Sequence, residues 1–392
     1  MTEFDIRQIN QFVLSRNYLF KKNKSNNLVN IIEEICGLHA TGIMEPYISL
    51  FNRIDNLKKE QFEQELYIRK NLARIRGIRK TLFIHTKNMI PIVYSATKHL
   101  TEKLFDKYLK VRGISPADYE TLSNKVLALL SQKEMSTSEI KKSLKSQKDI
   151  GAVISIMSDK MLLIRSKPIK SWKDRRIRFA LFKKCFPDID IDKYSESKAI
   201  RLLIEKYLKS YGPSTENDII WWTGLTKTKI MKALNELKRM IRIIKISNFA
   251  SQYLILDSDF ESLKNFELTS NKVVNLLPQL DPYLMGYKDR ERYIEYNNYE
   301  FVFDRSGNIT STILLDGKII GVWETLEKPN PLIKLLFFGK IEEDILDKVY
   351  REAYRIGKFI LDQEVVIEEC HQMIPLTKRT AGGFMTPLKD CN

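Results

Sequence analysis

Residues 197–240, "SKAIRLLIEKYLKSYGPSTENDIIWWTGLTKTKIMKALNELKRM", decide the fold of this chain. The stretch predicts three helices in close succession. Gly212 and Pro213 separate the first helix from the second, and Gly224 allows a tight turn into the third. Thr226 is a typical N-cap for that third helix. The stretch therefore predicts a small helical unit.

Two short strands are expected directly after these helices, "IRIIKI" at 241–246 and "SQYLILD" at 251–257. Helices followed by a two-stranded ribbon are the order of a winged helix, in which one helix usually enters the major groove of DNA and the ribbon touches the backbone. We interpret Trp221 and Trp222 as core residues of this unit.

The same order of elements is predicted twice more, upstream. Ser136 and Glu139 form a capping box that opens a helix, residues 150–161 predict a second helix, and "LLIRSKPIKSW" with "RRIRFALF" predict a hairpin. Nearer the N-terminus, several helical stretches precede "LARIRGIRKTLFIHT", which predicts a ribbon that bends near Gly77. Three such events indicate a structural repeat without sequence identity.

The C-terminal part has a different pattern. Stretches such as "YEFVFD", "STILL" and "KIIGVW" predict strands, Asp316-Gly317 predicts a hairpin turn, and a long helix is expected at 342–361. We therefore predict an α+β fold of three tandem winged-helix modules followed by a C-terminal β-barrel-like domain. The expected boundaries are 1–90, 91–190 and 191–265 for the three modules, and 266–392 for the barrel with its long helix and a tail.

Positive charge is concentrated in the predicted ribbons. The 392 residues include 65 Lys and Arg against 49 Asp and Glu, which gives a net charge of +16. Basic clusters occupy 69–80, 160–184 and 227–245, and each one follows a helical stretch and runs into a ribbon. This distribution predicts a polyanionic partner, with double-stranded DNA as the first candidate. The competing interpretation is that a lysine-rich composition reflects an AT-rich genome.

Individual DNA-contacting residues follow from these clusters. The predicted contacts in the three ribbons and their helices are Arg74, Arg76, Arg79, Lys80, Arg165, Lys167, Arg175, Arg176, Lys227 and Lys229. In "YKDRERY", the alternate spacing of Lys288, Arg290 and Arg292 places three cations on one side of an extended segment, which is consistent with phosphate contact. For any one of these residues alone, a solvated surface position is the competing interpretation.

Several other classes of protein are disfavoured. No apolar run approaches the ~20 residues of a membrane span, and the polar start "MTEFDIRQINQF" has no signal-peptide core. The four cysteines form no CxxC pair, which argues against a zinc site and for a reducing compartment. No Walker loop or GxGxxG occurs, so no cofactor and no metal are expected. We predict a cytoplasmic, nucleoid-associated protein, monomeric because three modules in one chain suffice to wrap one duplex.

Five stretches of the chain resemble the winged-helix DNA glycosylases of the AlkZ/YcaQ type. They occur in order as "GLHATGIMEPYISLFNRI", "IRGIRKTLFIH", "LIEKYLKSYGPSTENDIIWWTGL", "LLPQLDPYLMGYKDRERY" and "ILLDGKIIGVW". The resemblance implies three winged helices that form a C-shaped basic surface for DNA, with a barrel hairpin that helps to grip the duplex. It also implies hydrolysis of the N-glycosidic bond of alkylated or crosslinked purines, without metal or nucleotide.

The resemblance assigns the chemistry to a tripeptide, Gln-x-Gln or Gln-x-Asp, that aligns with His39-Ala40-Thr41. A neutral His39 can accept a proton from water, as its reference pKa of ~6.5 permits, whereas Thr41 can only form hydrogen bonds. The alternative is that His39 and Thr41 cap the end of a helix. His85 aligns with a position that often carries His, and is expected to contact the DNA backbone or to pack beside the cleft.

Two functions are compatible with the sequence. The first is a monofunctional DNA glycosylase with His39 and Thr41 as its catalytic residues. The second is a non-catalytic winged-helix DNA-binding protein, either a regulator or an inactive homologue, and the changed motif positions favour it. The sequence therefore leaves enzymatic activity open.

Overall fold

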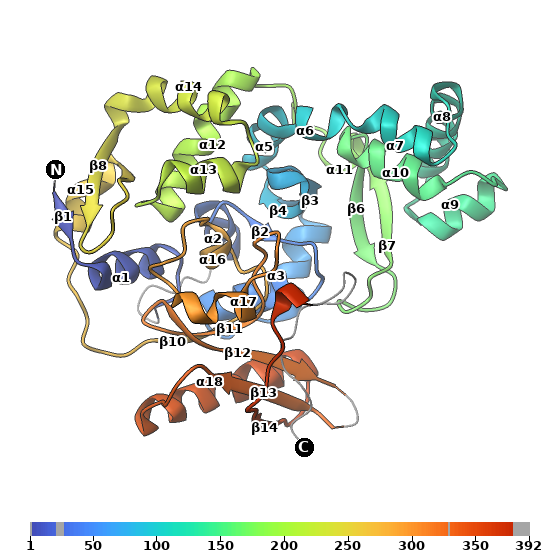
Figure 1. Cartoon of the computed structure of the whole chain (residues 1–392). Coiled ribbons are helices and arrows are strands. Elements are labelled where there is room, and N and C mark those ends of the chain that lie inside the picture. The colour runs from blue at the N-terminus through green and yellow to red at the C-terminus, as the bar shows by residue number, and fades with distance from the viewer. Residues whose placement is uncertain (1, 21–26, 328–329, 379–392) are drawn as a thin grey trace.

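The computed structural model describes residues 2–20, 27–327 and 330–378. Within them, three units combine helices with a three-stranded sheet, and a fourth part carries a five-stranded sheet (Figure 1). The expected α+β composition is confirmed. The tail expected after the last helix lies outside the described residues from position 379 onward.

The third unit forms as the local signals predict. The hydroxyl of Thr226 caps the last helix by accepting a hydrogen bond from the backbone of Lys229 at 3.4 Å. Gly224 ends the preceding helix with a φ of 71°, which glycine adopts without steric cost. Trp222 is buried, but Trp221 is half-buried and lies under the guanidinium of Arg79. The unit comprises α12 (Glu196–Tyr211), α13 (Glu216–Thr223), α14 (Lys227–Leu237), β8 (Ile241–Ile246) and β9 (Tyr253–Leu256), and β1 (Glu3–Phe4) pairs parallel with β8.

The first and second units each hold a sheet in which a two-residue strand lies beside a hairpin. The capping box at Ser136 forms as predicted, with Ser136 donating its backbone N–H to Glu139 at 2.7 Å. The first unit comprises α2 (Leu28–Glu34), β2 (Leu38–His39), α3 (Glu45–Arg53), α4 (Lys59–Glu63), β3 (Leu72–Arg76) and β4 (Leu82–Thr86). The second comprises α8 (Pro116–Gln132), β5 (Met135–Ser136), α9 (Thr137–Leu144), α10 (Ile150–Asp159), β6 (Leu163–Pro168) and β7 (Ile177–Leu181).

The C-terminal sheet is open in the described residues, so the expected barrel is not found. Its strands follow the order β10 (Val274–Leu277), β11 (Thr312–Leu315), β12 (Lys318–Leu326), β13 (Leu332–Phe337) and β14 (Val366–Glu369). The long helix α18 (Glu343–Leu361) packs its apolar face against this sheet, so one face is covered without closure. The strand predicted at "YEFVFD" is wrong, because residues 299–302 form the short helix α17.

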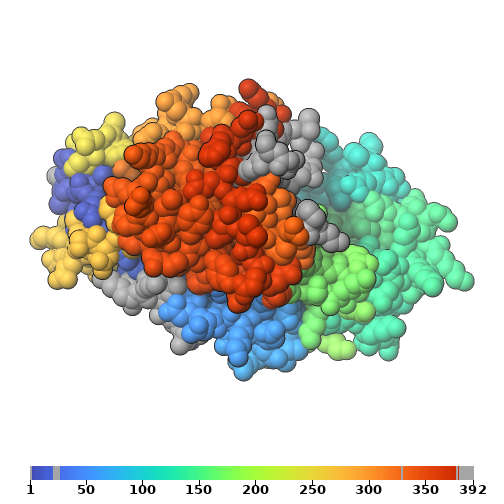
Figure 2. All heavy atoms as spheres, turned by 90° about the horizontal axis from the view of Figure 1, so that it is seen from below, coloured from blue at the N-terminus to red at the C-terminus, as the bar shows by residue number. Residues whose placement is uncertain are grey.

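Short helices connect these parts. They are α1 (Ile6–Arg16), α5 (Met89–Thr97), α6 (His99–Glu102), α7 (Phe105–Val111), α11 (Phe182–Cys185), α15 (Asp257–Lys264), α16 (Pro282–Met285) and α17 (Tyr299–Val302). The apolar core divides unevenly among the units. The second unit has a core of its own, whereas the other units share cores with each other and with the C-terminal sheet. The second unit accordingly forms a separate lobe at one end of the molecule (Figure 2).

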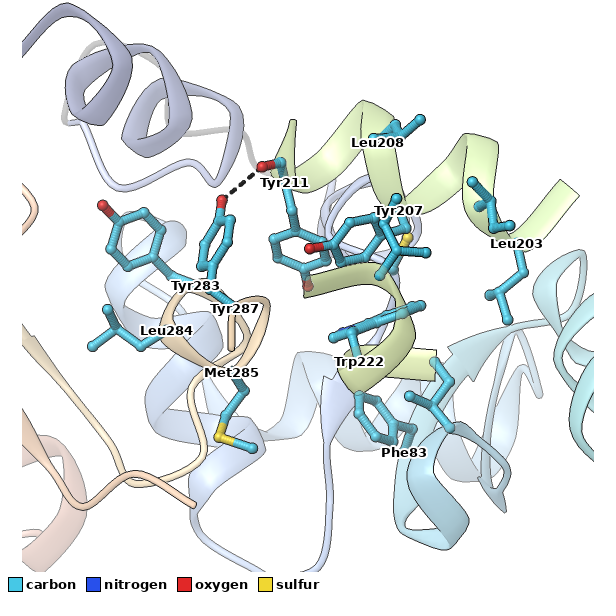
Figure 3. Packing of buried hydrophobic residues seen from close by; sticks show 14 of the residues in the cluster. Phe83, Leu203, Tyr207, Leu208, Tyr211, Trp222, Tyr283, Leu284, Met285 and Tyr287 are labelled. Atoms are coloured by element: carbon cyan, nitrogen blue, oxygen red, sulfur yellow. Dashed lines mark hydrogen bonds between the residues drawn. The ribbon is translucent and has the colours of Figure 1, made fainter. Parts of the chain in front are cut away.

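Two of the stretches that carry the family resemblance pack against each other in this shared core (Figure 3). Tyr287 donates its hydroxyl proton to the carbonyl of Tyr211 at 2.8 Å, and Tyr207 donates to the carbonyl of Gly286 at 2.7 Å. Asp218 accepts hydrogen bonds from the backbone of residues 288 and 289. These stretches therefore join the third unit to the C-terminal part.

Candidate functional site

The His39-Ala40-Thr41 tripeptide lies on a strand and the loop that follows it. His39 ends the two-residue strand β2 and pairs with Phe83 of β4. The preceding helix α2 already ends at Glu34. The alternative that His39 and Thr41 cap a helix is therefore wrong. Instead, residues 40–44 lead from the sheet into helix α3.

His39 is almost fully buried beneath the loop. Its side chain is 5% exposed, its ring lies 4.8 Å from that of Phe83, and its Nδ1 has no hydrogen-bond partner among the described residues. Burial and the nearby charge of Arg79 lower the pKa of His39 to about 3. The imidazole is consequently neutral at pH 7 and is a weak base.

Thr41, in contrast, is exposed. Its hydroxyl can donate and accept hydrogen bonds at the surface of the loop but has no acid–base capacity near neutral pH. Together, the two motif positions offer one neutral imidazole and one hydroxyl, and neither supplies a negative charge.

A carboxylate does stand next to the tripeptide, at a position that the sequence did not single out. Glu45 is the first residue of α3 and is 6% exposed. Gln279 donates its side-chain N–H to Oε1 of Glu45, and Oε2 has no partner among the described residues. The only signal in the sequence was an acidic residue just before Pro46, which is common in a first helical turn.

Glu45 lines a pocket of about 360 Å³ between α3, the start of the segment after β10 and the end of β12. The other polar groups that matter here are Gln279 and Ser311 on the wall, and Lys173 and Arg175, which come from the loop between β6 and β7. Trp323 adds an apolar wall. The second unit and the C-terminal sheet thus contribute to one pocket with the first.

A cluster of cations lies on the other side of the tripeptide. Arg74 donates a hydrogen bond to the carbonyl of Ala40, and Arg76 forms an ion pair with Asp159 at 2.9 Å. Burial and the charges of Arg76 and Arg74 lower the pKa of Arg165 to about 10. Arg76 and Arg165 therefore lie near the carboxylate of Asp159 where β3 meets β6. Arg74 lies near Arg165 and interacts with Glu45.

The other predicted DNA contacts divide by exposure. Exposed side chains are those of Lys80, Lys167, Arg175, Arg176, Lys227 and Lys288, and half-buried ones are those of Arg74, Arg76, Arg79, Arg165 and Lys229. Of the half-buried group, Lys229 contacts Glu196 and His99, and Arg79 stacks on Trp221 at 3.8 Å. Of the exposed group, Arg176 forms an ion pair with Asp174 at 2.9 Å, so exposure alone does not make a cation available to a phosphate.

Three predicted contacts are wrong, because the side chains are buried. Arg290 is 3% exposed and donates to the carbonyls of Tyr287 and Gly307 at 2.9 and 2.7 Å. Arg292 is also 3% exposed and lies over the ring of Tyr287 at 4.5 Å. The segment 287–293 is folded into turns rather than extended, so its alternate residues do not share an outer face.

His85 is the third of these residues. It is fully buried, neither ring nitrogen has a partner among the described residues, and burial lowers its pKa to about 3. A Cβ at Gly37 would lie 2.5 Å from Nδ1 of His85, so the imidazole fills the space that this glycine leaves. His85 therefore packs behind the tripeptide, so of its two expected roles only the contact with the DNA backbone is contradicted.

Small helix-and-sheet units that present cations around a short polar loop define a protein that acts on a polyanion. The chain belongs to the AlkZ-like DNA glycosylase family, since the family model "DNA glycosylase AlkZ-like" matches residues 32–359. The family resemblance noted in the sequence is thereby confirmed, and membership of this family implies that the protein binds DNA.

A solved structure supports the same fold. The chain is similar to the Streptomyces sahachiroi DNA glycosylase AlkZ, with a TM-score of 0.75 and 17% identity over 94% of this chain and 100% of that one. No curated protein matches the sequence. Among the described residues, no helix has the length and apolarity needed to cross a bilayer. The same part of the chain contains no group of three His, Cys, Asp or Glu side chains placed to hold a metal ion.

Proposed function

We propose that this protein is a monofunctional DNA glycosylase that hydrolyses the N-glycosidic bond of N7-alkylated or crosslinked purines in double-stranded DNA. The observation that carries the proposal is the loop at 40–45 in a chain of the DNA glycosylase family. This loop lies between a guanidinium cluster and a pocket that contains a buried carboxylate. Base excision requires cations that hold the phosphates of DNA. It also requires a polar group beside them that faces the sugar.

The chemistry needs little from the protein. Alkylation at N7 places a positive charge on the purine, so the base is already a good leaving group. As the C1′–N9 bond breaks, the charge moves to the sugar, which becomes oxocarbenium-like, as in glycoside hydrolysis. A site that stabilises this charge and directs a water molecule is sufficient, and neither a metal nor a nucleotide cofactor takes part.

We further infer that the three helix-and-sheet units are winged helices arranged in tandem, with boundaries at 1–90, 91–190 and 191–265 and a C-terminal part at 266–392. Their hairpins carry the exposed Lys80, Lys167, Arg175 and Arg176, which fits backbone contact by the wings. A monomer that acts on the nucleoid in the cytoplasm accords with three DNA-contacting units in one chain.

A non-catalytic DNA-binding protein is the second candidate, and one observation favours it. With a pKa of about 3, His39 is too weak a base to activate water by itself, and Thr41 cannot replace a carboxylate. If the tripeptide alone carried the chemistry, this chain would bind damaged DNA without cleaving the base from it.

The test is base release from a duplex with a single 7-methylguanine, measured by chromatography with protein in excess. We expect release above the spontaneous rate and an abasic site that breaks only on alkaline treatment. His39→Ala should slow release, whereas the control His99→Ala should not, because His99 lies on α6 and contacts Glu196 and Lys229 instead. Release at the spontaneous rate with intact DNA binding would establish the non-catalytic alternative.

A further inference from the structure

The carboxylate of Glu45 is buried and forms no ion pair within 4 Å in residues 2–20, 27–327 and 330–378, although Arg74 lies close enough to interact with it electrostatically. One oxygen accepts a hydrogen bond from Gln279, and the other has no donor. Burying a carboxylate without full pairing costs free energy, so such groups are rare outside functional sites. The free oxygen of Glu45 is therefore the most conspicuous unused group next to the tripeptide.

The surrounding contacts hold this carboxylate in place. Gln279 is positioned by its own backbone N–H, which donates to the hydroxyl of Ser311 at 3.1 Å. Trp323, on the same wall, donates its indole N–H to the carbonyl of Leu277 at 2.9 Å. A fixed carboxylate in a partly apolar pocket interacts more strongly with a nearby charge than one in water does.

The loop after Thr41 is shaped around Glu45. A Cβ at Gly42 would lie 1.9 Å from Oε2, a distance that no side chain can occupy. Only glycine at this position lets the carboxylate approach the backbone of the tripeptide loop. Oε2 of Glu45 therefore lies against Gly42, the residue that follows the exposed Thr41 in the sequence.

A structural role at the start of α3 explains part of this arrangement. The helix dipole favours an acidic residue in the first turn, which makes a carboxylate tolerable there. The dipole does not explain why Oε2 lacks a donor while its side chain lines a pocket with Lys173 and Arg175. Glu324 and Glu327 also line this pocket, and Lys173 pairs with Glu327 at 3.1 Å. A lining with three carboxylates and two cations suits a ligand that brings positive charge into the pocket.

We propose that Glu45 is the catalytic carboxylate of this site and that its pocket receives the reacting deoxyribose. This rests on the proposed glycosylase function. The C1′–N9 bond breaks with its electron pair going to N9, and the sugar gains the positive charge. The oxygen of water attacks C1′, and one proton of that water passes to the carboxylate of Glu45. The products are the free purine and an abasic site, and Glu45 returns its proton to solvent.

Glu45 suits this role better than either motif position does. A carboxylate attracts the sugar more strongly as the charge leaves the base, so it stabilises the transition state more than the bound substrate. The neutral His39 and the hydroxyl of Thr41 have no such preference and are left to orient the water or the sugar. Glu45, at the start of α3, thereby supplies the polar group that Gln or Asp provides in the family tripeptide.

The test compares wild type, Glu45→Gln and the control Glu120→Gln, which removes an exposed carboxylate that belongs to α8 in the second unit and does not line the pocket. Two duplexes serve as probes, one with a cationic pyrrolidine in place of the sugar and one with a neutral tetrahydrofuran. We expect wild type to bind the cationic duplex about 10-fold more tightly than the neutral one. Glu45→Gln should lose this preference and release 7-methylguanine about 100-fold more slowly, whereas Glu120→Gln should keep both properties.

Each outcome separates the two proposals. Base release by wild type that is unchanged in Glu45→Gln overturns the role of Glu45 alone. No base release by wild type overturns the proposed function and the role of Glu45 with it. If Glu45→Gln does not fold, Glu45→Asp replaces it, because it keeps the charge but withdraws it by one methylene. The Glu45→Asp protein should still prefer the cationic duplex but release 7-methylguanine more slowly than wild type. An unchanged rate of base release contradicts the proposal.

Discussion

Acid is expected to destabilise this protein through His39 and His85. Burial lowers the pKa of both imidazoles to about 3, from an ordinary value of 6.5. Between these values the unfolded chain binds protons that the folded chain does not, so stability is present above pH 6.5 and is lost as the pH falls. From pH 7 to pH 5, each histidine lowers the free energy of unfolding by about 2 kcal/mol, and the pair lowers it by about 4 kcal/mol.

The variant His85→Leu isolates one of these contributions. Leucine has a similar size, fits an apolar site and does not titrate. Urea unfolding followed by circular dichroism at pH 7 and pH 5 should show a loss that is smaller by about 2 kcal/mol than in wild type. If wild type and His85→Leu lose the same free energy of unfolding between pH 7 and pH 5, the conclusion that His85 is buried as a neutral imidazole is refuted. As an independent check, the Cε1 proton signal of His85 in the folded protein should not titrate above pH 5.

Three further predictions follow from the contacts. Arg53→Leu should destabilise the fold by about 3–5 kcal/mol, since it leaves Asp281 unpaired in a fully buried, two-bond ion pair, and thermal unfolding measures this loss. Lys288→Ala should weaken duplex binding in a mobility shift without lowering the melting temperature, whereas the buried Arg290→Ala should lower the melting temperature, and the reverse pattern would contradict the assigned exposures. Trp172→Ala should raise amide hydrogen exchange in the β6–β7 loop about tenfold, because Trp172 anchors that loop to α3 and α18; unchanged exchange would show that other contacts hold it.

The separate core of the second unit bears on the pocket that contains Glu45. Its hairpin loop reaches across to the first unit, where the ring of Trp172 lies 4.8 Å from that of Tyr47 and under the ammonium of Lys59 at 4.5 Å. The same loop supplies Lys173 and Arg175 to the pocket, so the position of the second unit affects the charge around Glu45.

Much of the secondary structure was predictable from short-range signals. The cap at Thr226, the capping box at Ser136 and the turn at Gly224 each involve atoms a few residues apart, and all three form as expected. The long C-terminal helix also lies where its apolar spacing places it. Sheet closure failed as a prediction because it depends on pairing between strands about 90 residues apart, and α18 covers the face that a barrel would enclose.

The candidate site was predictable only in outline. The loop at 39–41 was found through its resemblance to a family motif, and the exposed cations of the hairpins through their clustering in the sequence. Arg290 and Arg292 were misjudged because a regular spacing indicates a common face only if the segment is extended, and this one turns into a core of tyrosine rings. Glu45 was given no role because an acidic residue at a helix start is ordinary.

By itself, the sequence determined the family, the basic character and the order of helices and strands, because these depend on composition and on neighbours along the chain. The tertiary structure alone decided which charges are free. Asp281 pairs with Arg53 and Asp159 pairs with Arg76, whereas Oε2 of Glu45 forms no ion pair in the described part of the chain, although the sequence presents all three carboxylates alike. The reason is physical: the energy of a charge depends on its burial and on partners that folding brings from distant parts of the chain.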